Sequence, residues 1–311
     1  MKAIVYHEFG NVDVLQKVEE STPSIQADQV LVKVKAVSIN PMDWKIRKGE
    51  MKLMSGSTFP KHTGVEFAGV IEDAGNSDFK KGDEVFGIVK NTMKEGALAA
   101  YVAVPSTSVW IKPAAIDFRR AASIPITGAA AVTMLEKMGD INANTQILVI
   151  GATGGLGMFL LQLLKQKGAN VTAVASTKAI EFATIWGAEA VIDYTVEDVL
   201  AGQKTYDIVI DLSGKMGYKS AKKIMKAKSL FLNPTPKPIE IPISLLKNLF
   251  TGKKHVVILS QPTTKNIIVL LDAVNRGLQI EINKVFPFAQ SVAAYQYAEK
   301  GGIIGKVVIE L

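Results

Sequence analysis

The sequence predicts an α/β protein of two domains, one rich in β-strands and one built around a doubly wound parallel sheet. A chain of 311 residues is longer than a single hydrophobic core usually supports. Short strand-like runs dominate the first 120 residues, whereas strands and helices alternate after them. A glycine-rich turn at 151–157 joins one such strand to a helix. We therefore expect one domain to comprise 1–120 and 280–311, and the other to span 121–279.

The β-rich domain is expected to consist of short strands separated by tight turns. Residues 30–39 alternate apolar side chains with lysines, which is the pattern of a half-buried strand. The last thirty residues of the chain return to short strands, including 305–309. Further strands are expected at 2–7, 64–73, 84–89 and 97–104.

The second domain is expected to contain strands that are buried on both faces, because their sequences are continuous apolar runs. Such strands alternating with helices imply a parallel sheet. The expected strands are 146–150, 170–175, 190–192, 206–211, 229–232 and 255–259, and the expected helices are 156–167 and 179–187.

Composition excludes several kinds of site. The chain has no cysteine, which rules out disulfides, thiolate nucleophiles and thiolate-bound metals. Only three histidines, His7, His62 and His255, are available, and they are widely separated. We therefore expect no metal site.

Charge and hydropathy argue against nucleic-acid and membrane partners. The formal net charge is +7, but the lysines occur as isolated pairs without interleaved aromatic residues, so we expect no nucleic-acid partner. Residues 147–164 are uncharged, yet glycines interrupt them, so a strand, turn and helix explain them better than a membrane span. The N-terminus lacks the pattern of a signal peptide, which favours a cytoplasmic location.

The glycine-rich turn, GATGGLG at 151–157, indicates a dinucleotide site. Glycines between a strand and a helix permit a tight turn, allow a pyrophosphate to approach the backbone and let the helix pack closely on the strand. In the spacing G-x-G-x-x-G, Ala152 replaces the first glycine; the turn also fits G-x-x-G-x-x-G. A P-loop is excluded because Met158 follows Gly157 where lysine is required. The expected pyrophosphate contacts are Gly154, Gly155, Leu156 and Gly157, and Ala152 and Thr153 are also expected to bind the cofactor.

The residues after the second strand of this domain indicate which dinucleotide is bound. A site specific for NAD places an acidic residue there to bind the ribose 2′-hydroxyl. This chain has Ser176, Thr177 and Lys178 instead. Hydroxyl donors and an ammonium group suit a 2′-phosphate, so we predict NADPH as the cofactor.

The turn alone is compatible with two families of dehydrogenase. Short-chain dehydrogenases need Tyr-x-x-x-Lys, and the chain contains Tyr218 and Lys222 at that spacing. In that family, however, the glycine turn lies near the N-terminus and the tyrosine far downstream. A chance match is the better explanation here.

Several motifs along the whole chain resemble the medium-chain dehydrogenase/reductase superfamily, in its zinc-independent quinone oxidoreductase, or zeta-crystallin-like, branch. They lie at 38–47, 64–70, 82–87, 121–128 and 305–308, together with the glycine turn. The resemblance implies a GroES-like catalytic domain, a Rossmann domain that binds NADPH, and a homodimer or homotetramer. Zinc-dependent alcohol dehydrogenases carry a cysteine near Asn40 and a histidine at the position of Val65. Both are missing here.

The resemblance also implies roles for individual residues. Asn40 and Thr127 would flank the nicotinamide and the acceptor, and Ser176, Lys178 and Tyr194 would surround the 2′-phosphate. Ser213 is a further candidate for contact with the cofactor. Without zinc, Lys45 is the cation best placed to stabilise charge on the acceptor, with Thr127 as a neutral donor.

The function implied is transfer of hydride from NADPH to a quinone or an α,β-unsaturated carbonyl compound. Two alternatives stay open at this point. One is a non-catalytic redox sensor that binds NADPH. The other is an enoyl-thioester reductase.

Overall fold

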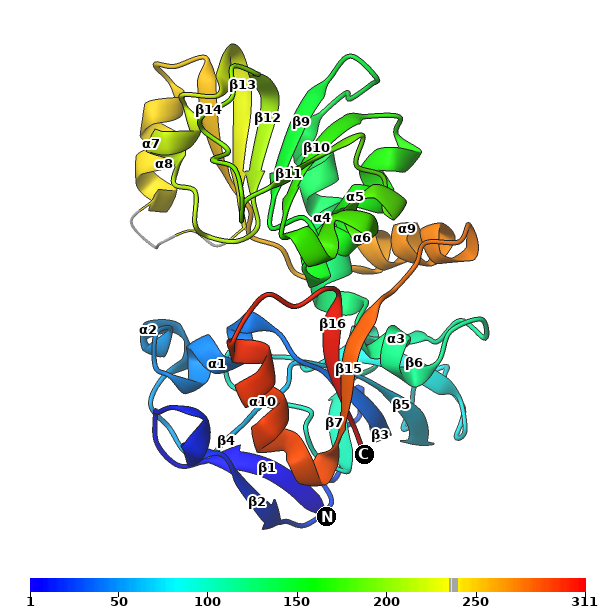
Figure 1. Cartoon of the computed structure of the whole chain (residues 1–311). Helices are drawn as coiled ribbons and strands as arrows, with labels where there is room; N and C mark the ends of the chain where they lie inside the picture. The colour runs from blue at the N-terminus through cyan, green and yellow to red at the C-terminus, as the bar shows by residue number, and fades with distance from the viewer. Residues whose placement is uncertain (235, 237–239) are drawn as a thin grey trace. The chain divides into compact units, whose positions relative to one another are not determined.

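The computed structural model describes residues 1–234, 236 and 240–311, and the chain divides into two compact units (Figure 1). Unit 1 consists of Met1–Ile126 together with Ile282–Leu311. Unit 2 consists of Thr127–Glu281. The chain thus leaves unit 1 to form unit 2 and returns to complete unit 1.

Unit 1 contains two sheets. The smaller has the order β2-β1-β4, and the larger has the order β15-β16-β3-β5-β6-β8, with β7 paired to β3. The smaller sheet is built from β1 (Lys2–Tyr6), β2 (Gln16–Glu19) and β4 (Lys61–His62). The larger is built from β3 (Gln29–Ser38), β5 (Glu66–Asp73), β6 (Glu84–Ile88), β7 (Tyr101–Pro105), β8 (Val109–Ile111), β15 (Ile282–Pro287) and β16 (Lys306–Glu310). The helices are α1 (Pro41–Arg47), α2 (Lys52–Ser55), α3 (Phe118–Ala122) and α10 (Ser291–Glu299), and the short 3-10 turns are η1 (Val12–Val14), η2 (Ser106–Ser108) and η4 (Phe288–Gln290).

Unit 1 differs from the expectation in two places. The strand expected at 97–104 begins only at Tyr101. The residues before it pair with β1 instead, through a single β-bridge between Ala3 and Ala99. The last thirty residues form not only strands but also α10. That helix buries Ala294, Tyr295 and Ala298 in the core, a spacing that places them on one helical face.

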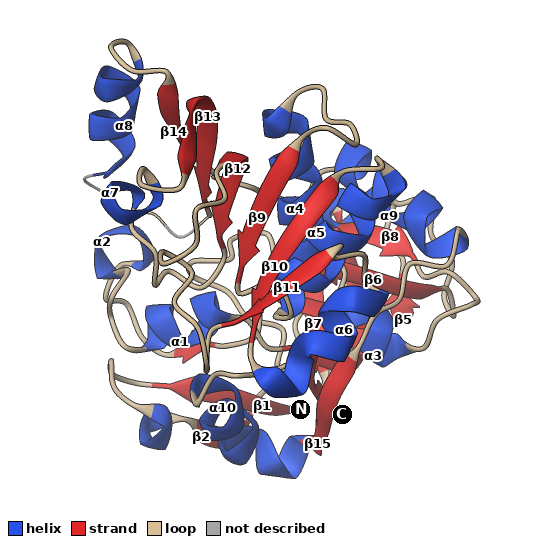
Figure 2. Cartoon of the chain, turned by 45° about the horizontal axis from the view of Figure 1, so that its top comes forward, coloured by secondary structure: helices blue, strands red, loops and turns tan. Residues whose placement is uncertain are grey.

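Unit 2 is a six-stranded parallel sheet of order β11-β10-β9-β12-β13-β14 (Figure 2). Its strands are β9 (Gln146–Ile150), β10 (Asn170–Ala175), β11 (Ala190–Asp193), β12 (Tyr206–Asp211), β13 (Met225–Asn233) and β14 (Lys253–Val257). Its helices are α4 (Pro125–Met138, which begins at the boundary between the units), α5 (Gly155–Gln166), α6 (Ile180–Ile185), α7 (Tyr218–Ala221), α8 (Glu240–Asn248) and α9 (Thr264–Asn275), with the turn η3 (Thr177–Ala179).

The position of β9 in this sheet determines where a ligand is expected. β9 comes first in the sequence of the sheet but lies in its middle, between β10 and β12. The strand order therefore reverses at β9, and in such sheets ligands bind beyond the carboxyl ends of the strands at the reversal point. Gly151 follows β9 directly, so the glycine turn lies at that point.

Within 1–234, 236 and 240–311, no helix is long and apolar enough to cross a membrane.

Candidate functional site

The tight turn after β9 is made by Gly151. Its φ of 74° lies in the left-handed region, which side chains other than glycine rarely adopt. Ala152, which the sequence placed at the first glycine of G-x-G-x-x-G, lies one residue later and is buried. The turn therefore uses the spacing G-x-x-G-x-x-G, with Gly151, Gly154 and Gly157 as its glycines.

Gly157 and Gly154 are glycines for different reasons. A Cβ at Gly157 would lie 2.2 Å from the carbonyl oxygen of Ala152, so close packing of α5 on the turn requires glycine there. A Cβ at Gly154 would have only one neighbour, the oxygen of Gly151 at 3.7 Å. Protein packing does not explain the glycine at 154. The open space above it can instead admit a ligand against the backbone.

The helix α5 adds an electrostatic reason for an anion at this place. Gly154 is its N-cap, and the first N–H groups of a helix have no partner within the helix. Together with the helix dipole, they attract phosphate. Thr153 is buried beside the turn, and Gly155 and Leu156 are partly exposed in the first turn of α5. The residues present therefore fit a pyrophosphate.

An acid from the neighbouring strand lies beside the end of β10, and the sequence analysis did not anticipate it. Ser176, Thr177 and Lys178 follow β10, with Thr177 and Lys178 exposed. Thr177 Oγ1 donates a hydrogen bond to Asp193 Oδ2 at 2.5 Å, from the end of the neighbouring strand β11. Ser176, Thr177 and Lys178 themselves include no acid, as the sequence indicated; Asp193 comes to them from another strand.

The Asp193 carboxylate is stabilised by hydroxyl groups around it. Hydrogen bonds from Thr177, and then from Thr195, lower the pKa of Asp193 below its ordinary value. The hydroxyl proton of Thr177 is committed to this carboxylate. Of the three residues that follow β10, Ser176 and Lys178, with its exposed ammonium group, keep side-chain donors for a phosphate.

The loop after β12 brings a second cation to this edge. Asp211, at the end of β12, accepts hydrogen bonds from Ser213 N at 2.9 Å and Met216 N at 2.8 Å, which folds the loop. The Nζ of Lys215 in that loop lies 5.9 Å from the ring centroid of Tyr194, which is exposed. Ser213 itself lies next to Gly151. Lys215 thus contacts both Tyr194, through its side chain, and Ser213, through its backbone N–H, which donates to Ser213 Oγ at 3.2 Å.

In unit 1, Asn40 is the centre of a buried polar network. Asn40 Nδ2 donates to Glu66 Oε1 at 2.8 Å, and Lys306 Nζ donates to Asn40 Oδ1 at 2.8 Å. Lys306 also forms an ion pair with Glu66 at 2.9 Å, and both side chains are almost completely buried. The other hydrogen of Asn40 Nδ2 points to the carbonyl of Ser38 at 3.4 Å. Both amide hydrogens of Asn40 are therefore in use.

Glu66 connects this network to the start of α4. Its Oε2 accepts the backbone N–H of Ile126 at 2.8 Å, in the first turn of that helix. A carboxylate at a helix N-terminus is stabilised by the helix dipole. Thr127 follows Ile126 directly and is half-buried. Lys45 lies on α1 and is also half-buried.

The remaining histidines and the Tyr-x-x-x-Lys match have structural surroundings. His62 lies 3.0 Å from Glu20 at a partly exposed position, and His255 stacks on Tyr218. The hydroxyl of Tyr218 donates to the carbonyl of Lys253, and Lys222 lies over the Tyr218 ring. These contacts join α7 to β14 and commit the tyrosine hydroxyl proton to a backbone carbonyl.

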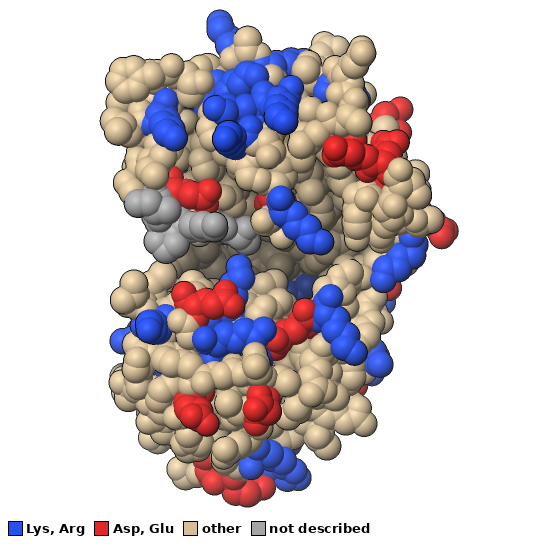
Figure 3. Space-filling model, turned by 60° about the vertical axis from the view of Figure 1, so that its left-hand side comes forward, with Lys and Arg blue, Asp and Glu red and all other residues tan. Residues whose placement is uncertain are grey.

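The residues present do not fit a zinc ion. Across 1–234, 236 and 240–311, no three His, Asp, Glu or Cys side chains gather into a metal-binding group. Val65, where zinc-dependent alcohol dehydrogenases carry a histidine, is buried and apolar. The charged side chains are unevenly distributed over the surface (Figure 3). Lys and Arg side chains gather at one end of unit 2, while the face of unit 1 in that view carries both basic and acidic side chains.

Four residues of these sites were not singled out by the sequence analysis: Glu66, Asp193, Lys215 and Lys306. Glu66 and Lys306 belong to quoted motifs, but only the pairing of β3 with β5 and β16 brings them to Asn40. Asp193 ends β11, and Lys215 lies in the loop after β12; neither belongs to a recognised motif. The only sequence signal was their proximity to predicted contacts: Asp193 precedes Tyr194, and Lys215 comes two residues after Ser213.

The fold and the glycine turn define a two-domain protein whose parallel-sheet unit fits a dinucleotide. The family described as "Alcohol dehydrogenase GroES-like domain" matches residues 26–114, and the one described as "Zinc-binding dehydrogenase" matches residues 186–309. The chain belongs to the quinone oxidoreductase branch of the medium-chain dehydrogenase/reductase superfamily. Its membership confirms the resemblance and the fold class expected from the sequence.

Three similar proteins indicate the range of the branch. The chain is 34% identical to an NADPH-dependent alkenal/one oxidoreductase of Arabidopsis thaliana, covering 99% of this chain and 79% of that protein. It is 33% identical to a 2-methylene-furan-3-one reductase of Solanum lycopersicum, with the same coverage. The solved structure of a quinone oxidoreductase from Coxiella burnetii has a TM-score of 0.89 at 30% identity, covering 100% of this chain and 99% of that one.

Proposed function

We propose that this protein is an NADPH-dependent reductase that transfers hydride to an α,β-unsaturated carbonyl compound or a quinone. The observation that carries the proposal is the glycine turn, with its open space above Gly154 at the N-terminus of α5. Relatives named for the reduction of alkenals, enones and quinones support the choice of acceptor.

The cofactor is held by unit 2. The turn that receives the pyrophosphate is formed by Ala152, Thr153, Gly154, Gly155, Leu156 and Gly157. Ser176 and Lys178 bind the 2′-phosphate, and Lys215 adds a second positive charge beside Tyr194. Thr177 contributes indirectly, because its hydroxyl holds Asp193. Ser213 borders the turn at Gly151.

The acceptor end of the reaction uses Asn40, Lys45 and Thr127. When bound, NADPH supplies the hydride. As hydride adds to an enone or a quinone, negative charge develops on the acceptor oxygen and needs a hydrogen-bond donor. Both amide hydrogens of Asn40 are already used in hydrogen bonds, so its side chain is held in place and cannot donate to the acceptor. One lone pair of its Oδ1 is left free. The donor role falls to Lys45 and Thr127.

A panel of acceptors tests the proposal. The loss of NADPH absorbance should be measured with quinones, alkenals, enones and acyl thioesters. Turnover with enones or quinones supports the proposal, and preference for acyl thioesters would identify an enoyl-thioester reductase. Binding of NADPH without any turnover would identify a redox sensor and reject the enzyme.

The homodimer or homotetramer expected from the sequence is supported by the edge of unit 2. Leu245, Leu246, Leu249 and Phe250, in α8 and just after it, are strongly exposed apolar residues, and α8 packs on the edge strand β14. A second copy of the chain would cover them. Leu246→Glu should then lower the mass measured by light scattering, whereas Leu53→Glu, at an exposed leucine of unit 1, should not. Equal masses for both variants would contradict this interface.

A cytoplasmic location stays a prediction from the sequence. Several relatives are named as chloroplastic or mitochondrial, so members of the branch work in more than one compartment. Fractionation of cells that produce the tagged protein would test it. Recovery with an organelle would contradict it.

A further inference from the structure

Asp43 is a buried carboxylate with only one of its two oxygens in use. It lies in the first turn of α1, and its Oδ2 accepts the backbone N–H of Asn40 at 2.8 Å. Its Oδ1 has no hydrogen-bond partner among the described residues. A buried polar atom without a partner is costly, so a group that could bind Oδ1 would stabilise the fold.

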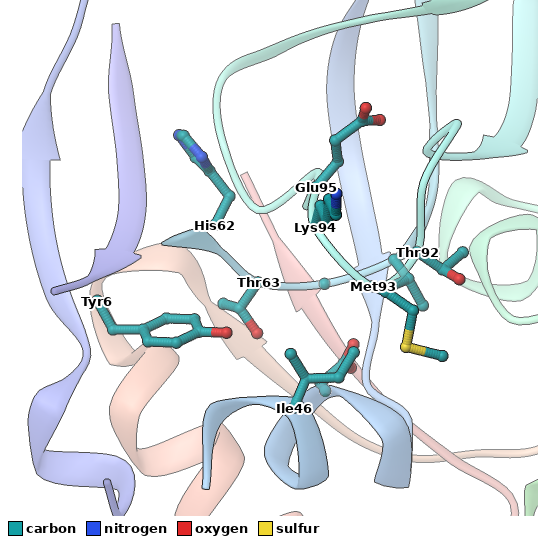
Figure 4. A pocket seen from close by; sticks show the side chains of 11 residues that line it. Tyr6, Ile46, His62, Thr63, Thr92, Met93, Lys94 and Glu95 are labelled. Carbon is teal, nitrogen blue, oxygen red and sulfur yellow. The ribbon is translucent and has the colours of Figure 1, made fainter. Parts of the chain in front are cut away.

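Asp43 borders a small cavity that has room for such a group. The cavity measures about 10 Å³, and Tyr6, Thr63 and Val65 are among the residues that line it. Figure 4 shows that Tyr6 directs its phenol oxygen toward Thr63, whereas the His62 ring points away. About 10–15 Å³ is the space that one water molecule requires. The cavity therefore matches a single water that could bond to Asp43 and to the neighbouring hydroxyls.

The groups around Asp43 set its protonation. Burial is the largest influence and raises the pKa of Asp43 to about 7; the Asn40 hydrogen bond lowers that pKa, the Glu66 charge raises it, and the Lys306 and Arg47 charges lower it. A charged carboxylate binds an N–H group more strongly than a neutral one. The titratable groups that face Asp43 or its cavity are Tyr6 of β1, Arg47 of α1, His62 of β4, Glu66 of β5, Lys94 and Glu95 of the loop after β6, Tyr295 of α10 and Lys306 of β16.

We propose that Asp43 is a positioning residue for Asn40, and that it holds an internal water in this cavity. Asn40 is then fixed from two sides. Glu66 and Lys306 hold its side chain, and Asp43 holds its backbone. When Asp43 loses its proton as pH rises, the hydrogen bond that it accepts from the backbone N–H of Asn40 becomes stronger. The proposal rests on the proposed function, in which Asn40 borders the acceptor.

Asp43→Asn tests the proposal, because asparagine keeps the size and one acceptor oxygen but does not titrate. The kcat/KM of the wild type should exceed that of D43N several-fold at pH 8, and the two should converge toward pH 6. Asp83→Asn is the matched control: Asp83 also accepts the N–H of the residue three positions earlier, Lys80, at 2.8 Å, but that hydrogen bond is exposed. D83N should follow the wild type. A ratio of wild type to D43N that is constant with pH would overturn the proposal.

Two measurements on the wild type do not depend on activity or on the folding of a variant. The backbone ¹⁵N–H signal of Asn40 should shift between pH 6 and 8 with the same midpoint as the carboxyl ¹³C signal of Asp43. An Asn40 signal that stays constant while Asp43 titrates would refute the positioning role. A high-resolution crystal structure should show an ordered water within hydrogen-bond distance of Asp43 Oδ1, and an empty cavity would refute the water site. If no acceptor is reduced, the proposed function fails while these results still stand.

Discussion

Replacing Lys306 by methionine should destabilise the protein because it leaves the Glu66 carboxylate buried without its cation. Lys306 and Glu66 are 3% and 0% exposed, and the Nζ of Lys306 also satisfies Asn40 Oδ1. Removal of one partner from a buried ion pair costs about 3–5 kcal/mol. Glu66 keeps its bonds from Asn40 Nδ2 and Ile126 N, so we expect the lower end, about 3 kcal/mol.

Thermal unfolding followed by circular dichroism measures this loss. For a unit of this size, about 3 kcal/mol corresponds to a fall in Tm of about 6–12 °C. The control is Lys81→Met, which breaks the exposed pair of Lys81 with Glu72 at 2.7 Å. An exposed pair is worth about 0–1 kcal/mol, so K81M should melt close to the wild type. The double variant K306M/E66Q, which removes the uncompensated charge, should regain part of the loss.

Equal melting temperatures for K306M and K81M would refute the reasoning. That result would mean that the buried pair contributes no more than a surface pair. A double variant less stable than K306M would also contradict it, because the carboxylate charge would then not be the source of the cost.

Four further substitutions test the assignment of single residues. Gly154→Ala should melt like the wild type but bind NADPH at least about tenfold more weakly, a change of about 1.4 kcal/mol. Gly157→Ala should instead lose stability, because its Cβ would lie 2.2 Å from the Ala152 oxygen. Calorimetric titration with NADPH and thermal melting distinguish the two variants, and undiminished NADPH binding by G154A would reject the glycine turn as the pyrophosphate site. Lys178→Glu should weaken NADPH far more than NADH, since it reverses the charge that faces the 2′-phosphate; equal losses for the two cofactors would reject that contact. Lys45→Met should lower kcat if the ammonium group stabilises the acceptor oxygen. Unchanged steady-state kinetics would show that Lys45 takes no part in the reaction.

The sequence was sufficient for the parallel sheet and its glycine turn because their patterns are local. β9 and β10 are mostly apolar, and the expected bounds, 146–150 and 170–175, agree with the structure. The helix α10 was missed because its polar residues obscure a buried face made of Ala294, Tyr295 and Ala298. Its apolar surface becomes clear only against the strands that cover it.

The buried network of unit 1 could not be predicted from spacing. Asn40, Glu66 and Lys306 are brought together by antiparallel pairing of β3 with β5 and with β16, across more than two hundred residues of chain. Asp193 shows the same limit in unit 2. Its position beside Thr177 follows from the register of β10 on β11, in which Ala175 pairs with Asp193, and not from any motif.

Transfer of deuterium from NADPH deuterated at C4 tests the central claim most directly. The protein should be incubated with this cofactor, carrying the label on the transferred face, and with an enone that it reduces. The account predicts that mass spectrometry finds one deuterium in the product, on the carbon that accepts hydride. A product without deuterium from either face of the labelled cofactor, or no product with any quinone or enone, would contradict it.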